Sequence, residues 1–248
     1  MGVGMSDVAL QDIDFTFEVD GQSTALHGLL GVPDGPGPWP GVVVLHEVFG
    51  VDEEMRKQVA HLARMGYLAL MPDLFSDGGF RRCISATMRA LSSGQGRAYA
   101  DIESARQTLL ADPRCTGSVG VIGFCMGGGF ALMTVGTGFD AASVNYGMMP
   151  KDLDGALENA CPIVTSYGAK DVTLKGATAR LEEALTRKGI PHDSKEYPKA
   201  GHVFMNETLN GPAVIKSLVR IMNFGPEPES AKDAWGRVEA FFGEHLKK

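Results

Sequence analysis

The stretch that decides the fold reads Val119-Gly120-Val121-Ile122-Gly123-Phe124-Cys125-Met126-Gly127-Gly128-Gly129. An apolar strand runs here into a helix through the pattern Gly-x-Cys-x-Gly-Gly, which is typical of a nucleophile elbow with cysteine as the nucleophile. The turn is so tight that the residues two before and two after the nucleophile must lack bulk, and Gly123 and Gly127 satisfy this requirement. Cys125 is therefore expected at a helix N-terminus, where the helix dipole and free N–H groups favour a thiolate and stabilise an oxyanion.

Two other interpretations of this segment are open. Cys125 can be a buried structural thiol, since free cysteine is among the most buried residue types. The glycines can also belong to a dinucleotide-binding turn, but Gly120-Val121-Ile122-Gly123 does not supply G-x-G-x-x-G, and the motif lies far from the first strand.

The rest of the chain alternates between strand and helix patterns. Apolar runs typical of buried parallel strands cover 41–45, 67–71, 119–124, 141–146 and 163–168, and a further strand is expected at 192–197. Helical patterns cover 53–65, 99–110, 126–135, 177–188 and 231–245. The runs 13–19 and 26–31, with a turn at Asp20-Gly21, predict an antiparallel hairpin before them. The segments 75–95 and 205–228 look like excursions on the rim that builds the pocket.

This alternation predicts an α/β protein with a doubly wound, mostly parallel sheet that opens with an antiparallel hairpin. The chain has 248 residues, of which 44% are hydrophobic, and this length suits one domain over residues 1–248.

The charge balance excludes several classes of partner. The chain carries 23 Lys and Arg against 30 Asp and Glu, for a net charge of −7, without a run of five like charges, which argues against nucleic-acid binding. No apolar stretch reaches the ~18 residues of a membrane helix, and the first residues do not resemble a signal peptide. We expect a cytoplasmic protein without membrane attachment, either a monomer or a homodimer.

The cysteines are scattered and lack the spacing of a metal site. They are Cys83, Cys115, Cys125 and Cys161, without a C-x-x-C pair or a histidine at metal-ligand spacing. Free thiols, no metal and no cofactor are the expectation.

An elbow needs a base and a residue that orients it. In the α/β-hydrolase fold these follow in the order nucleophile, acid, histidine. Asp171 follows the strand at 163–168, and His202 follows the strand at 192–197, so both are expected on the same rim as Cys125. Alone, such an aspartate is more often a turn or cap residue, and such a histidine is more often structural or exposed. The required order makes Cys125, Asp171 and His202 a predicted catalytic triad.

The rim also receives His46-Glu47-Val48-Phe49-Gly50, directly after the strand at 41–45. The spacing is not H-E-x-x-H, which excludes that type of zinc protease site. In α/β-hydrolases this loop supplies an oxyanion donor, so the backbone N–H groups of Val48 and Met126 are predicted to form the oxyanion hole. Glu47 can equally be a carboxylate favoured by a helix start.

Segments in matching order over nearly the whole chain resemble the dienelactone hydrolase family. They are His46-Glu47-Val48-Phe49-Gly50, Pro72-Asp73-Leu74-Phe75, Gly123-Phe124-Cys125-Met126-Gly127-Gly128, Gly168-Ala169-Lys170-Asp171 and Ala200-Gly201-His202-Val203-Phe204. The resemblance implies an α/β-hydrolase fold and a Cys-His-Asp triad acting on a small ester or lactone without a cofactor. It also implies that Glu47 contacts the resting thiol and helps to deprotonate it when substrate enters.

The chain departs from the founding members of this family in one respect. They hold a substrate carboxylate with two arginines, one on the excursion after the fourth strand and one shortly after the histidine. Arg81 or Arg82 can stand for the first, but residues 203–207 contain no arginine. A neutral or differently charged ester therefore fits better, with Phe49 and Phe204 lining the approach.

The sequence thus predicts a carboxylic ester or lactone hydrolase that works through a thioester. Dienelactone hydrolase proper (carboxymethylenebutenolidase) and a related ester or acyl transfer on the same triad are the enzymatic alternatives. A ligand-binding protein and a redox-sensing thiol on the same fold are the non-enzymatic ones, the latter disfavoured because no resolving cysteine is adjacent.

Overall fold

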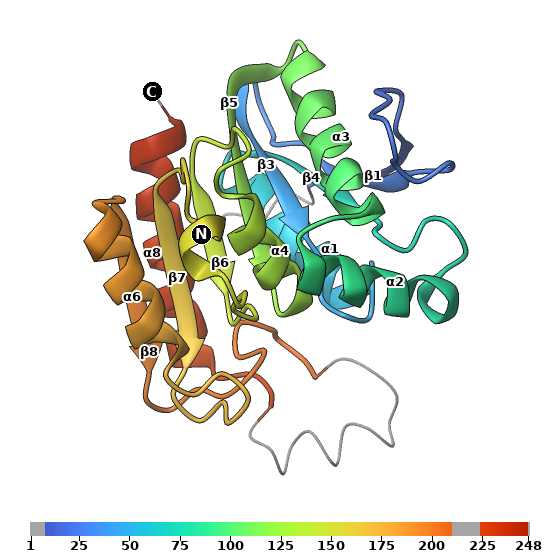
Figure 1. The fold of residues 1–248 in the computed structure, drawn as a ribbon. Coiled ribbons are helices and arrows are strands. Elements are labelled where there is room, and N and C mark those ends of the chain that lie inside the picture. The colour runs from blue at the N-terminus through green and yellow to red at the C-terminus, as the bar shows by residue number, and fades with distance from the viewer. Residues whose placement is uncertain (1–7, 210–223, 248) are drawn as a thin grey trace.

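The computed structural model describes residues 8–209 and 224–247, which form one mixed sheet covered by helices on both faces (Figure 1). The sheet has eight strands in the order β1-β2-β4-β3-β5-β6-β7-β8. β1 and β2 pair antiparallel, β2 joins β4 antiparallel, and all later pairs are parallel. The strands are β1 (Leu10–Asp14), β2 (His27–Gly31), β3 (Trp39–Leu45), β4 (Leu68–Pro72), β5 (Cys115–Phe124), β6 (Ala142–Asn145), β7 (Ile163–Gly168) and β8 (His192–Tyr197).

The helices divide between the two faces of the sheet. One face carries α1 (Glu53–Arg64) and α8 (Pro228–Leu246). The other carries α2 (Phe80–Ser93), α3 (Arg97–Ala111), α4 (Met126–Thr134) and α6 (Ala177–Lys188), with the short α5 (Leu153–Ala156) between α4 and α6. This is the doubly wound arrangement that the sequence predicts.

Strand residues alternate between two hydrophobic cores. In β3, Val43 and Leu45 face the core under α3 and α4, whereas Val42 and Val44 face the core under α1 and α8. Because both faces are covered, these strands are apolar throughout and show no polar alternation. The burial of both faces holds the carboxyl ends of the parallel strands in a fixed rim, from which the functional side chains project.

The N-terminal hairpin is confirmed, but its bounds differ from the prediction. β1 begins at Leu10 and ends at Asp14, and the turn at Asp20-Gly21 lies within a longer connection, where the Gln22 N–H donates to the Val19 carbonyl at 3.1 Å. The predicted excursion at 75–95 contains a helix, α2, whose buried residues Cys83, Thr87, Ala90 and Leu91 recur at helical spacing. The sequence prediction missed it because glycine stands at both of its ends and no side chain caps its start. The excursion at 205–228 falls largely outside the described residues.

Across the described part of the chain, no helix is long and apolar enough to span a membrane.

Candidate active site

Cys125 lies in a strained backbone conformation at the junction of β5 and α4. Its φ is 53° and its ψ is −113°, a conformation that non-glycine residues seldom adopt and that persists only where the surroundings impose it. The Cys125 N–H donates to the Asn145 carbonyl at 3.1 Å, and the Cys125 carbonyl accepts from the Gly129 N–H at 3.1 Å. The side chain is half-buried at the start of α4, as expected for an elbow nucleophile.

The elbow glycines are required by close backbone contacts. A Cβ atom on Gly123 would overlap the Gly127 carbonyl, and one on Gly127 would overlap the Leu45 carbonyl. Gly128 likewise packs against the Asn145 carbonyl. These contacts bring the end of β3, with the loop at 46–50, directly beside Cys125.

The structure brings the three predicted triad residues together. His202 Nε2 lies 3.0 Å from Cys125 Sγ, and His202 Nδ1 lies 2.5 Å from Asp171 Oδ2. Asp171 Oδ1 accepts from the backbone N–H of Thr173 at 3.0 Å and from its hydroxyl at 2.6 Å. Asp171 is 1% exposed, so its hydrogen bonds replace the water that burial removes.

The electrostatics of this chain favour a protonated imidazole. Burial opposes a charge on the His202 ring, but its hydrogen bonds with Asp171 and Cys125 outweigh burial and raise its pKa to about 10. Burial likewise acts to raise the pKa of Asp171, but the hydrogen bond and charge of His202, together with Thr173, lower it overall. Asp171 therefore stays ionised and holds the Nδ1–H, which leaves Nε2 to exchange a proton with sulfur.

The loop after His202 has a second strained residue. Val203 has a φ of 54°, which is costly for a β-branched side chain. Phe204 follows and is fully buried, with its ring 5.6 Å from that of Tyr146 and 5.0 Å from that of Tyr197. The sequence prediction that Phe204 lines the approach to the sulfur is wrong for this structure, because the residue packs in the core and supports the His202 loop.

Glu47 is buried beside the triad and held by polar groups from other elements. Asn206 Nδ2 lies 3.2 Å and 3.1 Å from its two carboxylate oxygens, and the Tyr146 hydroxyl lies 3.5 Å from Oε1. Tyr146 also packs against His202, with ring centroids 5.3 Å apart. Burial and the charges of Glu47 and Cys125 raise the pKa of Tyr146 well above its usual value, so its hydroxyl keeps its proton.

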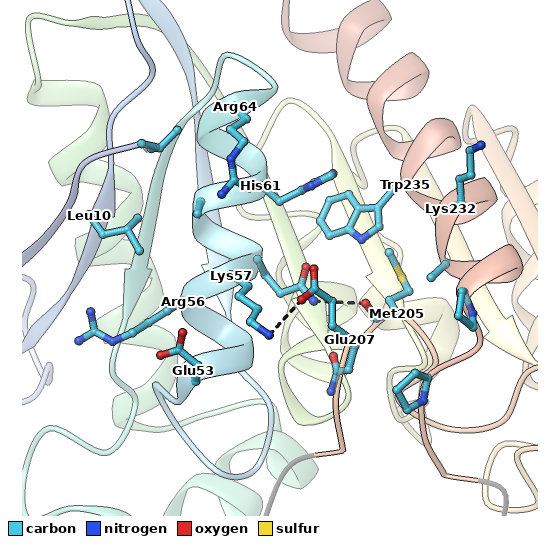
Figure 2. Close-up of a pocket in the computed structure, with 17 residues that line it drawn as sticks. Leu10, Glu53, Arg56, Lys57, His61, Arg64, Met205, Glu207, Lys232 and Trp235 are labelled. Atoms are coloured by element: carbon cyan, nitrogen blue, oxygen red, sulfur yellow. Dashed lines mark hydrogen bonds and ion pairs between the residues drawn. The ribbon is translucent and has the colours of Figure 1, made fainter. Parts of the chain in front are cut away.

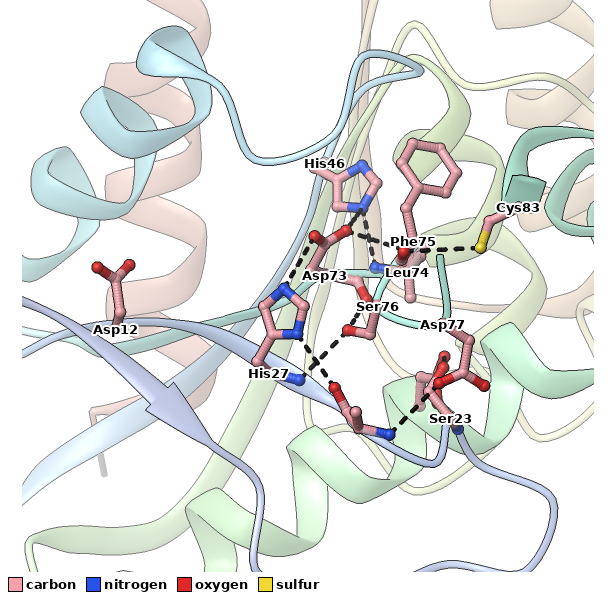
Figure 3. Close-up of polar contacts among 12 residues, drawn as sticks. Asp12, Ser23, His27, His46, Asp73, Leu74, Phe75, Ser76, Asp77 and Cys83 are labelled. Carbon is pink, nitrogen blue, oxygen red and sulfur yellow. Dashed lines mark hydrogen bonds and ion pairs between the residues drawn. The ribbon is translucent and has the colours of Figure 1, made fainter. Parts of the chain in front are cut away.

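The loop that carries Glu47 is fixed by the neighbouring His46 (Figure 3). His46 Nε2 accepts from the Leu74 N–H at 3.1 Å, so Nδ1 carries the proton and donates to the Glu47 carbonyl at 2.7 Å. Burial lowers the pKa of His46, which keeps the ring neutral. The Phe75 ring packs against it at 5.0 Å. His46 thus connects the loop after β3 to the loop after β4.

The residues predicted to supply the oxyanion donors come from the loop after β3 and from the start of α4. Val48 and Phe49, both half-buried, sit at the tip of a turn in which the Gly50 N–H donates to the Glu47 carbonyl at 3.1 Å. Met126 is the first residue of α4, whose first-turn N–H groups have no partner within the helix.

Arg81 and Arg82 are exposed in the first turn of α2. Neither guanidinium forms a hydrogen bond or ion pair with another described residue. Both remain available to solvent or to a ligand.

Three residues near the triad were not predicted from sequence. Thr173 had a usable signal, since Asp-x-Thr after a strand is a common local hydrogen-bonding motif. Tyr146 and Asn206 had none, because only the fold brings them to Glu47. Among the described residues, no group of three or more His, Cys, Asp or Glu side chains is placed to hold a metal ion.

The sheet order and the placement of the elbow define an α/β-hydrolase fold, and solved structures agree. A putative dienelactone hydrolase from Klebsiella pneumoniae superposes with a TM-score of 0.73 at 24% identity, covering 95% of this chain and 99% of that chain. A dienelactone hydrolase-like promiscuous phosphotriesterase from metagenomic libraries gives a TM-score of 0.74 at 21% identity, covering 97% and 99% of the respective chains.

The sequence model of the dienelactone hydrolase family matches residues 26–246, and the chain belongs to this family. A carboxymethylenebutenolidase from Rhodococcus opacus is 29% identical over 221 residues, covering 83% of this chain and 81% of its own length. A putative carboxymethylenebutenolidase from Methylorubrum extorquens is 28% identical over 235 residues, covering 86% and 75% of the respective chains. Membership of the family makes the chain a hydrolase of ester or lactone bonds.

Proposed function

We propose that the chain hydrolyses a carboxylic ester or lactone through a thioester on Cys125. The observation that carries this proposal is the 3.0 Å approach of His202 Nε2 to Cys125 Sγ at a helix N-terminus. His202 takes the thiol proton as sulfur attacks the carbonyl carbon, and the leaving alkoxide then takes this proton from the imidazolium. His202 then removes a proton from a water molecule that attacks the thioester. The C–S bond breaks, the acid is released, and the imidazolium returns the proton to sulfur.

The oxyanion formed in each attack is assigned to the N–H groups of Met126 and Val48. The first-turn position of Met126 and the turn at Glu47–Gly50 support this assignment. Donors held in place before the reaction need no reorganisation when the negative charge appears.

Two carboxylates act on the proton shared by Cys125 and His202. Asp171 stabilises the imidazolium and draws the proton onto nitrogen. Glu47, whose charge acts on the same tyrosine as that of Cys125, disfavours a second negative charge nearby and so opposes the effect of Asp171. A resting thiol is less readily oxidised than a thiolate.

The test of this function is a screen of chromogenic esters and small lactones, combined with the intact mass of the protein after rapid quenching. We expect a burst of product and a mass increase equal to the acyl group, located on Cys125. A ligand-binding protein would give neither signal, and a redox-sensing thiol would react with a thiol reagent but give no burst. Either result would contradict the proposed hydrolysis.

Glu47→Gln should have opposite effects on the resting thiol and on turnover. Without substrate, iodoacetamide should alkylate Cys125 faster at neutral pH, because the repulsion of the thiolate is gone. If Glu47 also accepts the thiol proton when substrate enters, kcat/KM for a poorly activated ester should fall, by roughly the 10²-fold typical of a general base. Absence of both changes would reduce Glu47 to a loop residue.

The exposed apolar side chains of the rim favour a neutral substrate. Phe80 (42% exposed) packs edge-to-face against Phe75, whose ring packs against His46. Met148 (47% exposed) follows β6, and Val172 (68% exposed) lies beside Asp171 after β7. Where the founding family members have a second arginine, residues 203–207 instead include Asn206, which binds Glu47. We infer an ester with an apolar acyl or alcohol group as substrate.

Met148→Ser should weaken the increase of kcat/KM with the length of the acyl chain. In the wild type, kcat/KM should rise from a nitrophenyl acetate to a hexanoate, since each methylene removed from water contributes up to about 0.8 kcal/mol, or about fourfold. The matched control is Leu110→Ser. Leu110 is exposed (37%) and lies at the end of α3, which leads into the amino end of β5, away from the rim. Equal slopes for the wild type and both variants would contradict the apolar substrate class.

A further inference from the structure

Side chains of helix α1 hold the loop after His202. Because Val203 adopts a φ of 54°, the segment that follows it needs firm anchoring to keep His202 in place. Gln58 Nε2 donates to the Met205 carbonyl at 3.3 Å, and Lys57 pairs with Glu207 at 3.0 Å. Figure 2 shows Lys57 directed from α1 toward Glu207, with Met205 on the side of α8.

Glu54 makes the strongest of these attachments. Its carboxylate is 2% exposed and accepts from the Glu207 N–H at 2.8 Å and from the Thr208 hydroxyl at 2.7 Å. Lys57 Nζ donates to it at 2.9 Å. Burial acts to raise the pKa of Glu54, but the bonds from Lys57, Thr208 and Glu207 lower it overall. A buried carboxylate with this many donors is ionised and rigidly held.

The same loop segment binds Glu47 on its other side. Asn206 lies between Met205 and Glu207, the two residues that α1 holds, and its amide nitrogen reaches both oxygens of Glu47. α1 itself begins at Glu53, shortly after the loop that carries Glu47. Glu54 therefore connects the two loops on which Glu47 and His202 are placed.

We propose that Glu54 is a positioning residue for the catalytic site: it holds the segment at 205–208 so that Asn206 keeps Glu47 beside Cys125. Losing this anchor releases Asn206 from Glu47, and the Glu47 charge then acts less strongly on the thiolate. This inference rests on the proposed role of Glu47, and Glu54 itself touches neither substrate nor sulfur.

The test is the pH dependence of Cys125 alkylation by iodoacetamide without substrate, with the modified residue identified by peptide mass. In Glu54→Gln, the midpoint of the profile should move to lower pH, in the direction of Glu47→Gln but by less. For an ester that the wild type hydrolyses, kcat should fall by roughly tenfold with KM little changed. The matched control is Glu53→Gln, because Glu53 has the same charge in the same helical turn but is exposed, and its profile should match the wild type.

A double-mutant cycle separates this mechanism from general destabilisation. If Glu54 acts through Asn206, the double variant Glu54→Gln/Asn206→Ala should have the profile of Asn206→Ala alone. Additive shifts would overturn the proposal, as would a lower melting temperature with an unchanged profile. Should Glu54→Gln fail to fold, Thr208→Val removes one bond to Glu54 and must move the midpoint in the same direction. Because alkylation needs no ester, a missing acyl-enzyme would contradict the proposed hydrolysis without deciding the role of Glu54.

Discussion

We expect Cys125→Ala to lower ester hydrolysis by about 10⁴-fold or more, because the proposed nucleophile is lost and neither His202 nor the proposed oxyanion donors can replace it. The fold should persist. Cys125 is half-buried, its backbone keeps the same φ of 53° with alanine, and no large cavity forms. The free energy of unfolding should change by less than about 1 kcal/mol, as for other substitutions away from a core.

The measurement is steady-state kcat/KM together with thermal unfolding of the same preparation. The control is Cys115→Ala, since Cys115 is also half-buried but lies at the start of β5, at the opposite end of the strand. That variant should keep its activity. Activity of Cys125→Ala within tenfold of the wild type would end the thioester hypothesis. Cys125→Ser should also lose much activity, because a hydroxyl depends on its base far more than a thiol does.

Much of the fold follows from patterns that the chain carries locally. The strands with continuous apolar runs were predicted within a few residues, since burial on both faces leaves no room for polar alternation. The elbow was predictable because a close backbone contact restricts its positions to glycine. A Cβ atom on Gly127, for example, would overlap the Leu45 carbonyl. α2 was missed because it has no side-chain N-cap and begins and ends at glycines, Gly79 and Gly94, which are more typical of a loop.

The candidate site divides in the same way. Cys125, Asp171 and His202 each follow a strand, so their meeting on one rim could be inferred from order alone. The environment of Glu47 could not, because Asn206 lies 159 positions away along the chain. Phe204 was misassigned since an aromatic residue next to a catalytic histidine looks the same in sequence whether it faces the pocket or the core.

Of the two strained residues Cys125 and Val203, the first belongs to the proposed triad and the second directly follows His202. Strain of this kind costs about 1–3 kcal/mol per residue and survives only where the surrounding structure determines it. Here the surroundings are the glycine contacts under Cys125 and the attachments of the 205–208 segment to α1. We therefore expect stability and catalysis to depend on the same contacts. Variants at the elbow glycines or in the 205–208 segment need measurements of both thermal unfolding and kcat/KM.

Asp171→Asn should reduce kcat by roughly 10²- to 10⁴-fold, although the side chain keeps its size. Asparagine can still accept from Thr173, but its NH₂ group meets the Nδ1–H of His202 with a second donor. The ring then favours the opposite tautomer, with its proton on Nε2 facing Cys125, and it can no longer take the thiol proton. Iodoacetamide should consequently alkylate Cys125 more slowly at neutral pH, the opposite of the change expected for Glu47→Gln.

The pH dependence of this variant has a definite sign. In the wild type, hydrogen bonds raise the pKa of His202 to about 10. Its contribution to the free energy of unfolding is therefore fully present below pH 6.5, roughly the pKa of histidine in the unfolded chain. It is lost as the pH rises from there through 10. The lowered pKa of Asp171 adds stability that is present above about 3.9 and lost as the pH falls through its folded value. In Asp171→Asn both dependences should weaken, and the alkaline limb of kcat/KM should move to lower pH. An alkaline limb at its wild-type position would show that Asp171 does not control the proton on His202, and His202 would then have to be oriented by the strained loop alone.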